Sequence, residues 1–133
     1  MINIENQVFD GLTKALTVSM PTIKTSSVYT NTPSSYPFVS IEEIDNSVYE
    51  RGMDSCKTEN FANVSYEIVV FTKSQNTKKT EAVSIAQLVD AYMETIGFVR
   101  DMKYARQNDN ETEYRIYLRY SGVISQSQVI YRR

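Results

Sequence analysis

The segment Phe61–Thr72 constrains the fold more than any other part of the sequence. Apolar side chains occupy every second position of one of its faces, at Val64, Tyr66, Ile68 and Val70. This period of two residues is typical of a β-strand. Val69 and Phe71 add apolar side chains on the opposite face, near the end of the segment. The segment therefore predicts a strand of a sheet that is apolar on both sides at one end.

Two segments repeat apolar residues at helical spacing. The first is expected over Asn3–Val18, with an apolar face made of Ile4, Val8, Leu12, Ala15 and Leu16. Asn3 can cap its N-terminus, and Pro21 follows its end. The second is expected over Thr77–Ile96, with an apolar face made of Ala82, Ile85, Leu88, Val89, Tyr92 and Ile96. Gly97 follows directly and can adopt the left-handed conformation that ends many helices.

Further segments rich in β-branched and aromatic residues predict strands at Thr22–Tyr29, Tyr36–Ile44, Phe98–Ala105 and Glu113–Gly122. Ser127–Tyr131 is left open as a last strand or an extended tail. The alternation is clearest over Glu113–Gly122, where one face carries Tyr114, Ile116, Leu118 and Tyr120. The other face carries Glu113, Arg115, Tyr117 and Arg119. We therefore expect the first set in the core and Tyr117 on the opposite side of the sheet.

The order of these elements predicts the fold class. Consecutive strands joined by short polar links favour antiparallel pairing, and two helices can cover one face of the resulting sheet. The prediction is an α+β fold with a mainly antiparallel sheet covered on one face by two helices. A mixed sheet stays open as an alternative where the long helix crosses between strands. The length of 133 residues fits one domain over residues 1–133, with a long hairpin loop at about Asp45–Asn60.

The composition excludes several classes of function. Histidine is absent and Cys56 is the single cysteine, so the sequence lacks the usual general base and cannot form a thiolate metal cluster. The four glycines are too far apart for a phosphate-binding loop. We therefore expect no enzyme, no catalytic or metal-binding residues and no cofactor.

Hydropathy and charge limit where the protein acts and which classes of partner it binds. No apolar run approaches the ~20 residues of a membrane span, and Met1–Glu5 lacks the features of a signal peptide. We expect no membrane partner. The net charge of −2 argues against nucleic acid as the main ligand. Residues 1–98 carry 7 basic and 12 acidic side chains, whereas residues 99–133 carry 7 basic and 4 acidic ones. This difference suits head-to-tail association, unless folding interleaves the two segments and cancels it.

Two small groups of polar side chains have the chemistry of binding sites but are incomplete. On a strand, Glu43 and Asp45 share a face that suits a hard cation or a shared proton, but calcium needs at least about four more oxygen ligands. A solvated sheet edge is the favoured interpretation. Tyr117 with Arg115 and Arg119 places an aromatic ring beside basic groups, as in single-strand binders. Three residues do not make a stacking platform, so no sequence-specific nucleic acid partner is expected.

The remaining features indicate interaction surfaces. The chain has 10 tyrosines and no tryptophan, and tyrosine is enriched at interfaces, although most of these residues are also explained by the strands. The polar stretch Asp45–Asn60 is longer than most structureless loops. It predicts a hairpin tip that contacts a partner or a neighbouring subunit. The candidate contact residues are Tyr49, Glu50, Arg51, Met53, Asp54 and Lys57.

This arrangement is similar to that of the tail terminator, or head–tail joining, proteins of long-tailed bacteriophages. The likeness rests on the amphipathic helix Asn3–Val18 and on the proline-bearing strand start Tyr36–Ile41. It also rests on the strand Tyr66–Ser74 running into the helix Thr77–Ile96, and on the closing strand Glu113–Gly122. The resemblance spans nearly the whole chain as pattern and order, without a short diagnostic motif.

The resemblance implies a ring, commonly of six copies, that caps the finished tail tube, ends its elongation and presents a surface to the head. The implied partners are further copies of the chain, the tail tube protein and a head connector or neck protein. The implied location is the virion, at the head–tail junction, after assembly in the host cytoplasm. Asp45–Asn60 and the basic residues Arg132 and Arg133 would contact a neighbouring subunit or the tube. The alternatives are a neck or head-completion adaptor of the same junction and a small non-enzymatic binding module.

Overall fold

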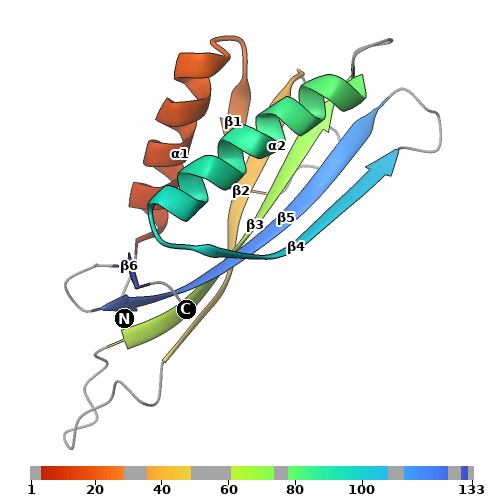
Figure 1. Ribbon diagram of the computed structural model, residues 1–133. Helices are drawn as coiled ribbons and strands as arrows, with labels where there is room; N and C mark the ends of the chain where they lie inside the picture. The colour runs from red at the N-terminus through yellow and green to blue at the C-terminus, as the bar shows by residue number, and fades with distance from the viewer. Residues whose placement is uncertain are drawn as a thin grey trace, which may run out of the picture.

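The strand predicted at Phe61–Thr72 is β3, and it lies in the middle of a six-stranded sheet (Figure 1). The computed structural model describes residues 4–28, 36–48, 61–73, 78–107, 113–125 and 130–131. Neighbouring strands follow the order β1-β2-β3-β5-β4, and β6 pairs with β5. The other strands are β1 (Lys24–Ser26), β2 (Phe38–Val48), β4 (Val99–Gln107), β5 (Tyr114–Ser125) and β6 (Ile130–Tyr131).

The sheet is mixed, but its parallel pair lies elsewhere than the sequence indicates. β1 runs parallel to β2, while the pairs β2–β3, β3–β5, β4–β5 and β5–β6 are antiparallel. The expected place for a parallel pair was across the long helix. That placement is wrong because the strands before and after the helix, β3 and β4, are not neighbours. β5 lies between them and is antiparallel to both.

Two helices, α1 (Glu5–Ser19) and α2 (Lys78–Thr95), lie on the same face of the sheet, which confirms the predicted α+β architecture (Figure 1). Their apolar sides form one core with the sheet residues that face them. The helices contribute Val8, Leu12, Leu16, Ala82, Ile85, Ala86, Val89 and Met93. The sheet contributes alternate residues of β3 and β5, among them Tyr66, Ile68, Ile116 and Leu118. Burial of apolar surface, worth roughly 25 cal/mol per Å², attaches the helices to the sheet.

The helix ends confirm one predicted cap and correct another. Gly97 follows α2 with a φ of 102°, the left-handed conformation that glycine adopts without a steric penalty. At the start of α1 the capping position is Ile4, not Asn3, and no side chain caps the helix there. The Ile4 side chain is 2% exposed and belongs to the core. Apolar packing therefore takes the place of a polar cap.

β2 is longer than the sequence predicts. It continues past Ile44, and the residues Asp45–Val48, expected to open a long loop, pair with β3. Polar residues are compatible with this stretch because the side chains of Asp45 and Ser47 are exposed. The loop that was expected from Asp45 therefore begins no earlier than the end of β2.

β3 confirms the prediction of a second apolar side. Val69 and Phe71 are fully buried and form a second cluster with Phe38 of β2, and Tyr36 and Tyr117 pack against this cluster. The cluster lies on the side of the sheet opposite the helices. We call this side the open face, because within the described residues no helix covers it (Figure 1).

Candidate interaction surface

The aromatic cluster on the open face is centred on Phe71. Phe38, from the neighbouring β2, meets the Phe71 ring edge to face, with 5.9 Å between the ring centroids. From β5 on the other side, the Arg115 guanidinium lies 4.9 Å from the Phe71 ring centroid, which is a cation–π distance. Phe71 is thus packed between side chains of both neighbouring strands.

The guanidinium of Arg115 is held in place by Glu113. Arg115 Nε donates to Glu113 Oε1, and the Tyr36 hydroxyl donates to Glu113 Oε2. Arg115 Nη1 also donates to the Tyr117 hydroxyl at 3.5 Å. Glu113 is only 4% exposed, so its carboxylate has little contact with water. The ion pair and the tyrosine hydroxyl supply the partners that a buried charge requires.

This network changes two pKa values. Burial, together with the bond to Glu113, raises the pKa of Tyr36 to about 12. Burial lowers the pKa of Arg115, but the bonds to Tyr117 and Glu113 outweigh it and raise that pKa above its usual value. Neither group exchanges a proton near neutral pH, so the network suits a structural role and not acid–base catalysis.

The next basic residue of the open face is also paired. Arg119 Nε lies 2.9 Å from Glu67 Oε2 on β3. Tyr117 lies between Arg115 and Arg119 along this face of β5, and its ring centroid is 6.2 Å from that of Tyr104 on β4. The prediction that these three β5 residues face away from the core is confirmed. Because both guanidinium groups are bound to carboxylates, they do not form a free basic platform for single-stranded nucleic acid.

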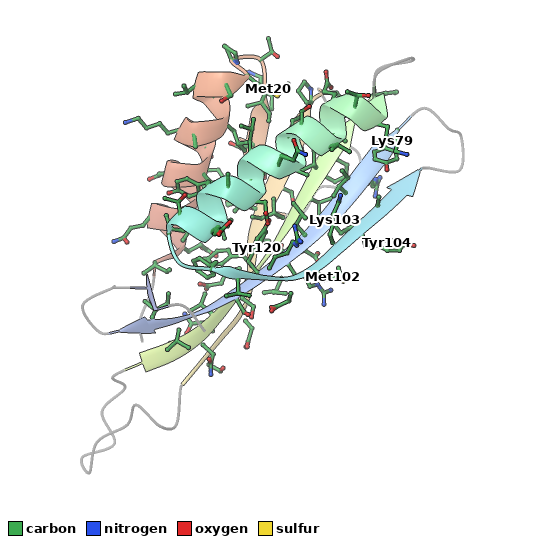
Figure 2. All side chains as sticks on the ribbon, viewed as in Figure 1. Met20, Lys79, Met102, Lys103, Tyr104 and Tyr120 are labelled. Atoms are coloured by element: carbon green, nitrogen blue, oxygen red, sulfur yellow. The ribbon has the colours of Figure 1, made fainter. Side chains whose placement is uncertain are left out.

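On the helix-covered face, two tyrosine hydroxyls reach carboxylates. The Tyr66 hydroxyl donates to Glu43 Oε1 on β2 at 3.2 Å. The Tyr120 hydroxyl, beneath α2 in Figure 2, donates to Asp90 Oδ1 on that helix at 2.9 Å. Arg100 Nη1 on β4 lies 3.3 Å from the same oxygen. Burial and the neighbouring carboxylates raise the pKa of both tyrosines, which keeps them protonated as hydrogen-bond donors.

The expectation that Glu43 and Asp45 share a face is wrong. The register shifts at Ile44, so that Glu43 lies opposite Tyr66 and Asp45 lies opposite Ser65. The two β3 residues are consecutive and point to opposite faces, and their partners do the same. Burial raises the pKa of Glu43, although the bond from Tyr66 opposes the shift. The described residues contain no group of three or more His, Cys, Asp or Glu side chains that could hold a metal ion.

β4 and most of β2 each have one outer edge that pairs with no other strand among the described residues. β4 pairs only with β5 there. On the opposite side of the sheet, β1 covers only Phe38–Ser40 of β2, and no described strand lies beside the outer edge of Ile41–Val48. Unpaired backbone groups at such edges are sites where another chain can add a strand.

Side chains along these edges are exposed, including apolar ones. Every residue of Val99–Ala105 on β4 is exposed, and Figure 2 shows Met102, Lys103 and Tyr104 along this margin. Met102 and Tyr104 are 37% and 55% exposed. On β2, Ile44 at the bulge is 41% exposed. The edges therefore combine backbone that pairs with no described strand and exposed apolar area, which is the composition of a contact surface.

The contact residues predicted from the sequence lie outside the described residues: Tyr49, Glu50, Arg51, Met53, Asp54, Lys57, Arg132 and Arg133. The two edges were not recognised as contact surfaces from the sequence. A usable signal was present in Val99–Gln107, where charged and apolar residues mix without regular alternation. Natural edge strands tolerate that pattern, whereas central strands do not.

Comparison with known proteins shows a similarity of fold and none of sequence family. No protein family model matches the chain, and no curated protein matches it. The fold is similar to that of a chain in a solved structure described as the virion of a native gene transfer agent (GTA) particle. The TM-score is 0.52 and the sequence identity is 16%, and the match covers 84% of this chain and 90% of that chain. At this identity the likeness establishes a shared fold.

Fold and surface together define a class of protein. It is an α+β protein with one helix-covered face, an aromatic and ion-paired open face, and two sheet edges that lack a described partner. None of the described helices is long and apolar enough to cross a bilayer.

Proposed function

We propose that this chain is a structural virion protein that forms a closed ring at the end of a tail tube, the role of a tail terminator. The observation that carries the proposal is the fold shared with a chain of the GTA virion, over 84% of this chain and 90% of that one. The resemblance in element order to phage tail terminators supports the same role. In this role the ring ends tail elongation and joins the tail to the head.

The described surface fits a protein that acts through contacts and not through catalysis. Tyr36 and Tyr120 are protonated hydrogen-bond donors at neutral pH, and their partners Glu113 and Asp90 are each bound to a guanidinium as well. Such networks rigidify a sheet. A rigid sheet with exposed edges holds contact residues in a fixed geometry, which repeated assembly into a closed ring requires.

The proposed partners are further copies of the chain in a ring of six, the tail tube protein, and a head connector or neck protein. The residues of 49–57 named above and Arg132 and Arg133 remain the proposed contacts to a neighbouring subunit or to the tube. The proposed location is the head–tail junction of a virion that is assembled in the host cytoplasm. No cofactor and no catalytic residue take part in this role.

The test is to measure the mass of the purified chain by light scattering over a wide concentration range and to image large species by negative stain. A closed ring that co-sediments with tail tubes is the expected result. A ring that binds the head connector but not the tube would favour the neck adaptor. A monomer or dimer that binds neither would overturn the proposal in favour of a small binding module.

A further inference from the structure

The two edges of the sheet carry opposite charge. The described side chains of β4 include Arg100 and Lys103 against Asp101, a formal charge of +1. β2 contains Glu42, Glu43 and Asp45 and no basic residue, a formal charge of −3. These strands lie at opposite sides of the sheet, with β3 and β5 between them. One side of the molecule is thus a basic edge and the other an acidic edge.

The strand directions suit pairing between copies in the same orientation. β2 is antiparallel to β3, β3 to β5, and β5 to β4, so β4 runs opposite to β2. When two copies stand side by side in one orientation, β4 of the first lies antiparallel to β2 of the second. Antiparallel addition at an edge is a common way in which a sheet extends into a partner.

We infer that β4 of one copy pairs with the outer edge of β2, over Ile41–Val48, in the next copy, so that the sheets join head to tail. This inference rests on the proposed function, because it specifies the contact through which the ring closes. Pairing of like edges would place +1 against +1 or −3 against −3 and is disfavoured. The unlike contact is heterologous, and heterologous contacts generate rings when the rotation closes.

The faces of the two strands place unlike charges together. Lys103 lies opposite Leu118 and therefore projects on the helix-covered face of β4. Glu43 lies opposite Tyr66 and projects on the same face of β2. With the helices of both copies on one side, Lys103 of one copy approaches Glu43 of the next. On the open face, the exposed Met102 and Tyr104 add apolar area to the contact.

Bulges limit which strands can use these edges. The register of β4 shifts at Asp101 and that of β2 shifts at Ile44, so neither edge is a long regular template. Natural edges use bulges and charges to block pairing with unrelated strands. On β4 the uninterrupted stretch is Met102–Gln107, which is enough for a short ladder. Complementary charge then selects the correct partner edge.

The experiment reverses one charge at a time, with K103E on β4 and E43K on β2. Each single reversal sets like charges against each other and should raise the concentration at half-assembly at least about tenfold. E43K keeps a hydrogen-bonding partner for the Tyr66 hydroxyl, because that oxygen can accept from an ammonium group. The substitution also removes the repulsion between Glu43 and Glu5. Circular dichroism checks that each variant is folded.

The decisive arm is an equimolar mixture of the two single variants. In an alternating ring, every contact is then either the native pair or the doubly reversed pair, so assembly should return to near the wild-type concentration. The double variant E43K/K103E should assemble by itself for the same reason. The matched control is K79E, an equal charge change at an exposed residue of the first turn of α2, which should leave assembly unchanged (Figure 2).

The possible results distinguish a failure of the proposed edge pairing from a failure of the proposed ring. A wild-type ring that persists in K103E and in E43K overturns the edge pairing and leaves the ring standing. Folded single variants that stay apart when mixed overturn it as well, because the reversed charges then do not meet. A wild-type chain that is monomeric at every concentration, both alone and with tail tubes, overturns both the ring and its contact.

Discussion

Tyr120 connects three elements, and removing its hydroxyl tests how α2 is attached to the sheet. Tyr120→Phe deletes the 2.9 Å hydrogen bond to Asp90 but leaves the ring, 1% exposed, in place. A hydrogen bond to a charged group contributes about 1.5–3 kcal/mol. The Asp90 side chain is 35% exposed and retains Arg100, so water partly replaces the lost donor. We therefore expect the free energy of unfolding to fall by about 1–2 kcal/mol.

Urea denaturation of the folded subunit measures this loss. The slope m should not change, because the same surface becomes exposed on unfolding. With m of about 1.5 kcal/mol/M, the midpoint should fall by roughly 1 M. In an Asp90→Ala background the acceptor is already absent, and Tyr120→Phe should then cost less than about 0.5 kcal/mol. An equal cost in both backgrounds would refute the reasoning, because the hydroxyl would then stabilise the fold by some other contact.

Three further predictions concern other parts of the fold. Gly11→Ala should lower the thermal midpoint despite the higher helix propensity of alanine, because the added Cβ meets the Tyr92 hydroxyl. Tyr92→Leu should remove that loss, and a rise in the midpoint with Tyr92 present would contradict the clash. Phe71→Ala should cost about 3–5 kcal/mol in urea denaturation, whereas Val18→Ala, at a site that is 76% exposed, should change stability by less than about 0.5 kcal/mol. Comparable effects of the two would argue against the burial of the open-face cluster. The free energy of unfolding should fall as the pH rises above about 10. In the unfolded chain Tyr36 loses its proton near pH 10, whereas in the folded chain its pKa is about 12, so deprotonation favours the unfolded state. The urea midpoint measured between about pH 9 and pH 11 checks this, and a constant midpoint would count against it.

Strong local periodicity was sufficient to predict the elements that build the core. The alternation in Phe61–Thr72 and Glu113–Gly122 correctly identified which side chains of β3 and β5 face the core. The helical spacing of Ala82, Ile85 and Val89 likewise identified the buried side of α2. These signals work because a buried face imposes its period on consecutive residues.

Features that depend on distant partners were not predictable in this way. The bulge at Ile44 separates Glu43 from Asp45, and it depends on how β2 and β3 fit together, which no local pattern records. The bond between Tyr36 and Glu113 joins residues 77 positions apart. The parallel alignment of β1 with β2 depends on the path of the chain between them. The contact residues proposed at 49–57 stay a prediction, since they lie outside the described residues.

The position of β5 has a consequence for how the chain is made. β5 lies between β3 and β4 although it follows both in the sequence. β5 (Tyr114–Ser125) pairs with both β3 and β4. Until β5 has been synthesised, neither strand can form these pairs. The sheet can therefore be completed only after β5 has been made, and its completion inserts a strand between two others instead of adding one at a margin.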